Sequence, residues 1–184
     1  ERCGQCLARR DHDIEVDLVS GVPDSGIGHA LGYAMESKKP YRRPLVKYTP
    51  GYGRSYTPPT QKTRDLVAKM KLIAINEVIK GNRVLLWEDY IVRGTQLKNY
   101  TIKKLWEAGA EEVHVRPACP PPMFPCKYNL STRSINELAT RKAIRSIEGH
   151  DVEDVSEYAD NSSEKYRRMV DWIAKDIEVT TLRF

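Results

Sequence analysis

Short apolar segments alternate with segments of helical periodicity along this chain. Residues 15–22 and 83–89 are apolar segments of strand length, and residues 112–116 are a third predicted strand. Residues 28–37 and 94–110, which lie between them, carry apolar side chains at helical spacing. Strands separated by helices are typical of βαβ units and therefore of an α/β protein with a mostly parallel sheet. Ligands of such sheets bind outside the carboxyl ends of the strands, so the residues that follow each apolar run are the candidate functional residues.

The remaining segments extend this pattern. We expect a short strand at 44–48, helices at about 61–71, 133–148 and 163–176, and a last strand in the tail 179–184. Residues 49–60 are rich in Gly, Pro, Tyr and Thr, which predicts a loop of unusual length.

The length and composition indicate one core domain with an addition. The chain has 184 residues, of which 40% are hydrophobic and 30% charged. We place the core at 1–150 and a C-terminal appendage, helical with a terminal strand, at 151–184. No apolar run reaches the roughly 18 residues that a membrane span needs, so we expect no membrane partner. The chain starts at Glu1 rather than Met, so we expect a fragment or a processed product.

The charge favours polyanionic ligands without selecting one. The net charge is +5, which suits nucleic acid, a phosphorylated metabolite or an acidic membrane surface. We expect no nucleic-acid partner, because the chain has no recognised binding motif and no basic patch interleaved with aromatic residues. Four cysteines are too few for a disulfide scaffold at this length. Reduced thiols and a cytoplasmic location are therefore expected.

The strongest chemical signal follows the apolar run at 83–89. The run ends in two acids, Glu88 and Asp89, and a short loop then leads to Gly94 and Thr95 at a helix start. Two carboxylates can accept hydrogen bonds from the vicinal hydroxyls of a sugar or hold Mg²⁺. Backbone N–H groups at the positive end of a helix suit a phosphate. Although acids at a strand end are often only solvated turn residues, this arrangement fits a ribose 5-phosphate.

These residues resemble a known family. The run V-L-L-W-E-D-Y-I-V-R-G-T at 84–95 is similar to the phosphoribosyl pyrophosphate (PRPP) motif of type I phosphoribosyltransferases. Its I-V-R-G-T ending resembles the version found in glutamine PRPP amidotransferases, also called amidophosphoribosyltransferases. V-P-D-S-G at 22–26, which by itself is a common turn, resembles the pyrophosphate loop of that family. The resemblance continues in order from about Val16 to Glu137.

The resemblance implies a type I phosphoribosyltransferase fold, which is a mostly parallel twisted sheet flanked by helices, with a long flexible loop. It implies PRPP and ammonia as substrates and Mg²⁺ as cofactor. The products would be 5-phosphoribosylamine and pyrophosphate, in the first step of de novo purine biosynthesis. In this family glutamine supplies the ammonia in a separate N-terminal glutaminase domain, which this chain does not include. The family also implies homo-oligomers and feedback by purine nucleotides.

The resemblance also implies roles for individual residues. The PRPP-binding residues would be Asp24, Ser25, Gly26, Arg54, Lys69, Lys71, Glu88, Asp89, Ile91, Val92, Arg93, Gly94 and Thr95. Ser25, Glu88 and Asp89 would hold Mg²⁺, and the loop from Ile91 to Thr95 would wrap the 5-phosphate. Arg54, Lys69 and Lys71 would neutralise the pyrophosphate once the loop at 49–60 closed as a lid, although Lys69 fits the wet face of an amphipathic helix equally well. No protein nucleophile is needed.

Several substitutions separate the chain from the family pattern. Glu88 stands where the family usually has Asp, Tyr90 where it has Ser, and Trp87 where it has a small or aliphatic residue. Ile73 stands where the family has an asparagine. These differences motivate an alternative hypothesis, a catalytically weak or inactive PRPP or nucleotide sensor with the same fold.

The cysteines admit two interpretations. Cys126 resembles a position at which some members of the family ligate a [4Fe–4S] cluster, whereas Cys3-x-x-Cys6 lies elsewhere in the chain than the Cys-x-x-Cys of those members. We expect plain buried thiols, with an iron–sulfur cluster at Cys126 as the alternative.

Overall fold

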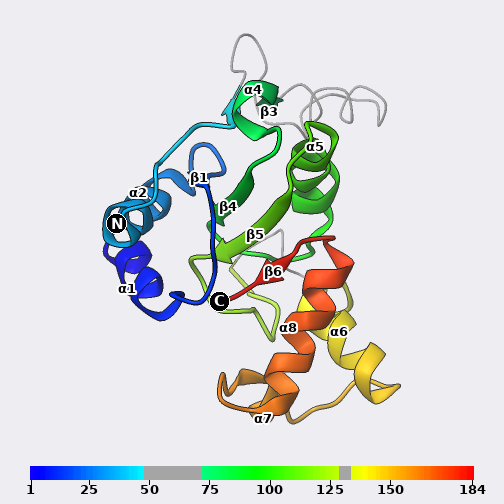
Figure 1. Ribbon diagram of the computed structural model, residues 1–184. Coiled ribbons are helices and arrows are strands. Elements are labelled where there is room, and N and C mark those ends of the chain that lie inside the picture. The colour runs from blue at the N-terminus through cyan, green and yellow to red at the C-terminus, as the bar shows by residue number, and fades with distance from the viewer. Residues whose placement is uncertain (48–71, 129–133) are drawn as a thin grey trace.

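The computed structural model describes residues 1–47, 72–128 and 134–184. In this part of the chain, β1 (Leu18–Gly21), β4 (Arg83–Glu88), β5 (Glu112–Pro117) and β6 (Thr181–Leu182) form a sheet of order β1-β4-β5-β6 (Figure 1). All three pairs of neighbours are parallel. The parallel sheet that the sequence predicts is therefore confirmed.

A second, smaller sheet lies beside the first. Strands β2 (Leu45–Lys47) and β3 (Leu72–Ala74) pair antiparallel, with Val46 opposite Ile73. The strand predicted at 44–48 is confirmed as β2, whereas β3 was not predicted. The loop predicted at 49–60 and the helix predicted at about 61–71 lie outside the described residues.

Helices cover both faces of the main sheet (Figure 1). The helical elements of the described residues are α1 (Arg2–Arg10), α2 (Ile27–Ser37), α4 (Asn76–Ile79), the π-helix η1 (Leu97–Ile102), α5 (Lys103–Glu107), the 3-10 helix η3 (Ile135–Glu137), α6 (Ala139–Glu148), α7 (Ser156–Ala159) and α8 (Glu164–Asp176). Helices α1 and α2 pack on one face, and α5, α6 and α8 pack on the other.

Strand β4 is buried on both faces, which explains its unbroken apolar sequence. Leu85 and Trp87 belong to the core cluster beneath α1 and α2, while Val84 and Leu86 belong to the cluster beneath α5, α6 and α8. All four side chains are completely buried. A central strand of a parallel sheet has no solvent face, so it carries no alternation of polar and apolar residues.

The C-terminal residues contribute to the same sheet and core. Strand β6 pairs with β5, with Leu182 opposite Val115. Met169 and Ile173 on α8 are completely buried in the cluster that contains Val115. Residues 151–184, which we expected as an appendage, thus supply the fourth strand of the sheet and a wall of its core.

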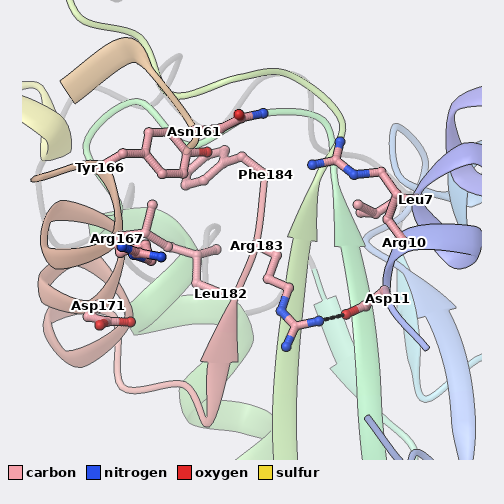
Figure 2. Close-up of a pocket in the computed structure, with 11 residues that line it drawn as sticks. Leu7, Arg10, Asp11, Asn161, Tyr166, Arg167, Asp171, Leu182, Arg183 and Phe184 are labelled. Carbon is pink, nitrogen blue, oxygen red and sulfur yellow. Dashed lines mark hydrogen bonds and ion pairs between the residues drawn. The ribbon is translucent and has the colours of Figure 1, made fainter. Parts of the chain in front are cut away.

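A buried ion pair ties the elements of one face together. The Asp11 carboxylate, just after α1, accepts hydrogen bonds from Nε and Nη2 of Arg116 on β5 at 2.6 and 3.0 Å. The same carboxylate accepts from the Tyr33 hydroxyl at 3.1 Å and from Arg183, as Figure 2 shows for the latter. Both Asp11 and Arg116 side chains are fully buried. Such a pair is stable only when its hydrogen bonds are satisfied, as they are here.

We expect the Asp11→Ala variant to lose about 3–5 kcal/mol of unfolding free energy, because it leaves the Arg116 charge buried without its partner. Asp13 is the matched control. It also pairs with Arg183 but its side chain is 59% exposed, so Asp13→Ala should lose at most about 1 kcal/mol. Chemical denaturation of both variants measures the difference. Equal losses would contradict the role of Asp11.

Candidate functional site

The two segments that the sequence singles out meet at the carboxyl ends of β1 and β4. These strands are adjacent and parallel, with Gly21 opposite Trp87, so the residues after each strand emerge at one edge. The Ser25 hydroxyl donates a hydrogen bond to Oε1 of Glu88 at 3.3 Å, across a sequence separation of 63 residues. The turn at 23–26 and the acidic pair therefore form one site.

Gly26 permits this close approach. A Cβ atom at Gly26 would lie 2.2 Å from the carbonyl oxygen of Trp87 and 2.8 Å from the backbone nitrogen of Val22. Neither backbone atom can move without breaking the hydrogen bond that Val22 N–H donates to Trp87 O at 2.8 Å. Only glycine fits between the turn and the strand at this position.

The acidic pair has an unusual affinity for protons. Burial raises the pKa of the Glu88 carboxyl to about 8, and the hydrogen bond with the Asp89 carboxyl acts in the same direction. The backbone N–H of Asp89 donates to Glu88 Oε1 at 3.1 Å, which opposes the shift. Two adjacent carboxylates that retain a proton near neutral pH form a site at which a cation can take the proton's place.

This pKa predicts a pH dependence of stability. The folded state binds the Glu88 proton up to about pH 8, whereas the unfolded chain releases it near the ordinary value of 4.5. The stabilisation is therefore complete below pH 4.5 and is lost as the pH rises through about 8. In buffer without divalent cations, the melting temperature of the unmodified chain should fall relative to that of Glu88→Gln as the pH rises from 4.5 to about 8. A difference in melting temperature between the two proteins that stays constant over this pH range would contradict the prediction.

The loop that follows the acidic pair is anchored at both ends. The Ile91 side chain is 3% exposed, and Gly94 adopts a positive φ of 76°. The carbonyl of Val92 accepts a hydrogen bond from Ala139 N–H at 2.7 Å. Arg93 and Thr95 are exposed. Helical residues begin at Thr95, two residues before η1, where the sequence predicts a helix start. The loop is thus fixed by its backbone, while its amide groups adjoin the start of a helix.

Lys47 is a residue of the site that the sequence analysis missed. Its Nζ lies 2.6 Å from Oδ2 of Asp24, in the turn after β1. The signal was its place at the end of the predicted strand 44–48, directly before the long loop. Arg54, Lys69 and Lys71, the cations that the resemblance implies, lie outside the described residues.

Trp87, the residue before the acidic pair, packs on the face of the sheet that α2 covers. Its ring stacks on the His29 ring of α2, with centroids 5.5 Å apart and an interplanar angle of 13°. The Tyr33 ring lies at 6.0 Å from it in a tilted arrangement. The large side chain therefore fills a space between β4 and α2. Burial lowers the pKa of His29, which the negative charge of Asp89 opposes.

The prediction of buried cysteines is wrong. Cys3, Cys6, Cys119 and Cys126 are all exposed. Helix α1 buries its Gly4, Leu7 and Ala8 face, which turns both of its cysteines outward. The other two lie in the proline-rich segment after β5, which forms no helix or strand.

The described residues contain no group of three or more His, Cys, Asp or Glu side chains placed to hold a metal ion. The residues at the acidic pair still fit Mg²⁺, because this ion is often held by one or two carboxylates together with water and substrate phosphates. Glu88 and Asp89 supply the carboxylates, and the Ser25 hydroxyl supplies a third oxygen.

A cavity of about 290 Å³ lies elsewhere, between α1, α8 and β6 (Figure 2). It is lined by Leu7, Arg10, Asp11, Asn161, Tyr166, Arg167, Val170, Asp171, Leu182, Arg183 and Phe184. None of the predicted PRPP-binding residues lines it, so it is distinct from the site at the acidic pair.

Comparisons with known proteins agree with this geometry, although no family model matches the chain. The chain is 40% identical over 142 residues to the chloroplastic amidophosphoribosyltransferase of Glycine max. It is 39% identical over 138 residues to the amidophosphoribosyltransferase of Methanocaldococcus jannaschii. These matches cover 77% and 75% of the chain but only 24% and 29% of the two relatives. The chain is a homologue of part of the amidophosphoribosyltransferases.

Solved structures agree with the sequence matches. Glutamine PRPP amidotransferase from B. subtilis, complexed with ADP and GMP, superposes with a TM-score of 0.68 at 34% identity. That match covers 98% of this chain and 33% of the B. subtilis chain. The resemblance and the type I phosphoribosyltransferase fold that the sequence predicts are therefore confirmed. Within the described residues, no helix has both the length and the apolar character needed to cross a membrane.

Proposed function

We propose that this chain is the phosphoribosyltransferase part of an amidophosphoribosyltransferase. Its reaction would be that of PRPP with ammonia, which yields 5-phosphoribosylamine and pyrophosphate in purine biosynthesis. The contact between Ser25 and Glu88 carries the proposal, because it joins the turn after β1 to the acidic pair after β4. A ligand with a phosphate at one end and a pyrophosphate at the other would span these two segments.

The groups of the site divide the work. The carboxylates of Glu88 and Asp89 would accept hydrogen bonds from the ribose hydroxyls, and the backbone of 91–95 would hold the 5-phosphate. Asp24, Ser25 and Gly26 would lie at the pyrophosphate, with the Lys47 cation beside them. Mg²⁺, held at Ser25, Glu88 and Asp89, would neutralise charge on the pyrophosphate.

The chemistry at the ribose needs no protein nucleophile. The ammonia nitrogen forms a bond to C1 as the bond from C1 to the pyrophosphate oxygen breaks, and the pyrophosphate leaves with the electron pair. The nitrogen then releases a proton to solvent. The protein contributes by holding both reactants, stabilising the leaving group and excluding water.

Further properties of the whole protein belong to the same proposal. Ammonia would come from glutamine in a glutaminase domain of the whole enzyme. Purine nucleotides would act as feedback ligands, consistent with ADP and GMP in the B. subtilis relative. A homo-oligomer in the cytoplasm completes the proposal.

One observation favours the alternative of a weak or inactive sensor. The raised pKa of Glu88 leaves the acidic pair with less negative charge near neutral pH, which weakens Mg²⁺ binding. Tyr90, whose side chain is 37% exposed, adds a large ring beside the loop. Such a site would still bind PRPP but would convert it slowly.

Pyrophosphate release tests the proposal. The chain, mixed with PRPP, Mg²⁺ and an ammonium salt above pH 8, should release pyrophosphate, and Asp89→Asn should abolish the release. The high pH supplies free ammonia and the ionised Glu88 carboxylate. Binding of PRPP by calorimetry without release would favour the sensor. Absence of both binding and release would contradict both functions.

A double variant locates any defect. The double variant Glu88→Asp with Tyr90→Ser restores the Asp-Asp pair and the small residue of the family. If turnover needs these residues, the variant should release pyrophosphate at least tenfold faster than the unmodified chain. The physical reason is that a misplacement of about 1 Å can cost about 10²-fold in rate. An unchanged rate would show that these two substitutions do not limit the reaction.

A further inference from the structure

Residues 137–139, at the end of η3 and the start of α6, contact the loop at 91–95 and hold it in place; we call this segment the brace. Arg93 Nη2 lies 2.5 Å from Oε2 of Glu137, the last residue of η3. Two residues later, Ala139 N–H donates to the carbonyl of Val92 at 2.7 Å. Leu138 and Ala139 are at most 1% exposed, so the brace is itself anchored in the core.

The loop is backed on its other side by α8 and the residues after it. A Cβ atom at Gly94 would lie 2.8 Å from Cγ2 of Ile177, which is completely buried. The loop therefore rests against the core at Gly94 and is held at Val92 and Arg93 by α6 and η3. Its backbone has little room to shift while these contacts persist.

The Arg93–Glu137 pair adds little to global stability. Both side chains are about half exposed, at 49% and 50%, and ion pairs in that setting contribute about 0–1 kcal/mol. The pair matters more for the position of the loop than for the free energy of unfolding, because it holds the Arg93 side chain against η3. The Arg93 guanidinium is then paired with the Glu137 carboxylate. The backbone N–H groups of the loop are the donors that would bind the 5-phosphate.

We infer that Glu137 is a positioning residue, which fixes the loop at 91–95 through Arg93 so that its amides receive the 5-phosphate of a phosphoribosyl ligand. The inference rests on the proposed function of this site. Arg93 itself acts through its pairing with Glu137 and not as the cation that binds the phosphate.

A direct contact between Arg93 and the phosphate would change the affinity of Glu137→Ala in the opposite direction. If Arg93 bound the phosphate directly, removal of Glu137 would release a cation toward the ligand and strengthen binding. If Arg93 positions the loop, removal of either partner loosens the same loop. The two single variants and the double variant would then lose the same affinity, since both act through one interaction.

Calorimetry with ribose 5-phosphate tests the inference. Arg93→Ala, Glu137→Ala and the double variant should each bind up to about fivefold more weakly than the unmodified chain, the ratio that corresponds to the loss of one such ion pair. Glu137→Gln, whose amide oxygen still accepts from Arg93, should retain part of the affinity. Binding of pyrophosphate with Mg²⁺, which occupies the other end of the site, should not change. Glu36→Ala is the control, because it breaks another ion pair, between Glu36 on α2 and Arg9 on α1, that does not touch the loop at 91–95. Its affinity for ribose 5-phosphate should equal that of the unmodified chain.

Three results would overturn the inference: unchanged or tighter binding of ribose 5-phosphate by Glu137→Ala, additive losses in the double variant, or an equal loss for pyrophosphate. If the unmodified chain does not bind ribose 5-phosphate, the proposed function fails at this site and hydrogen exchange decides the positioning role. Amides 93–95 should exchange several-fold faster in Glu137→Ala than in the unmodified chain and in Glu36→Ala. Equal exchange would refute the brace.

Discussion

The parallel pairing of β1 with β4 is the constraint on which the site depends. It sets Gly21 opposite Trp87, so that two turns far apart in the sequence leave the sheet side by side. The Ser25 hydroxyl can then reach Glu88, and a glycine at 26 is needed where the first turn crosses the second strand. Because β4 is buried on both faces and has Arg83 and Glu88 at its two ends, a slip of this register would carry a charged side chain from one strand end into the core.

Much of this arrangement was predictable, for local reasons. The runs at 15–22, 83–89 and 112–116 are rich in valine or leucine, and the four consecutive apolar residues from Val84 to Trp87 are the mark that a strand buried on both faces leaves on its sequence. The candidate site residues directly follow two of these runs, which is where parallel sheets bind their ligands. The helix α1 was not predicted, since only part of its surface is apolar and its mean hydropathy is low.

The missing features depend on residues that are distant in sequence. Asp11 and Arg116 are 105 residues apart, and neither shows alone that it will be buried against the other. Lys47 and Glu137 join the site only through their partners, Asp24 and Arg93. The exposure of the four cysteines depends on which face of α1 packs against α2 and on the path of the chain after β5. Pairing of this kind is a property of the tertiary structure.

The stack of Trp87 on His29 constrains how this site can change in evolution. The indole, one residue before the acidic pair, occupies the space between β4 and α2. Since Trp87 is completely buried, a smaller residue at 87 would leave a cavity between β4 and α2, and the His29 ring would lose its stacking partner. The two positions are therefore expected to be replaced together, so a lineage that acquired one large ring here would retain its companion.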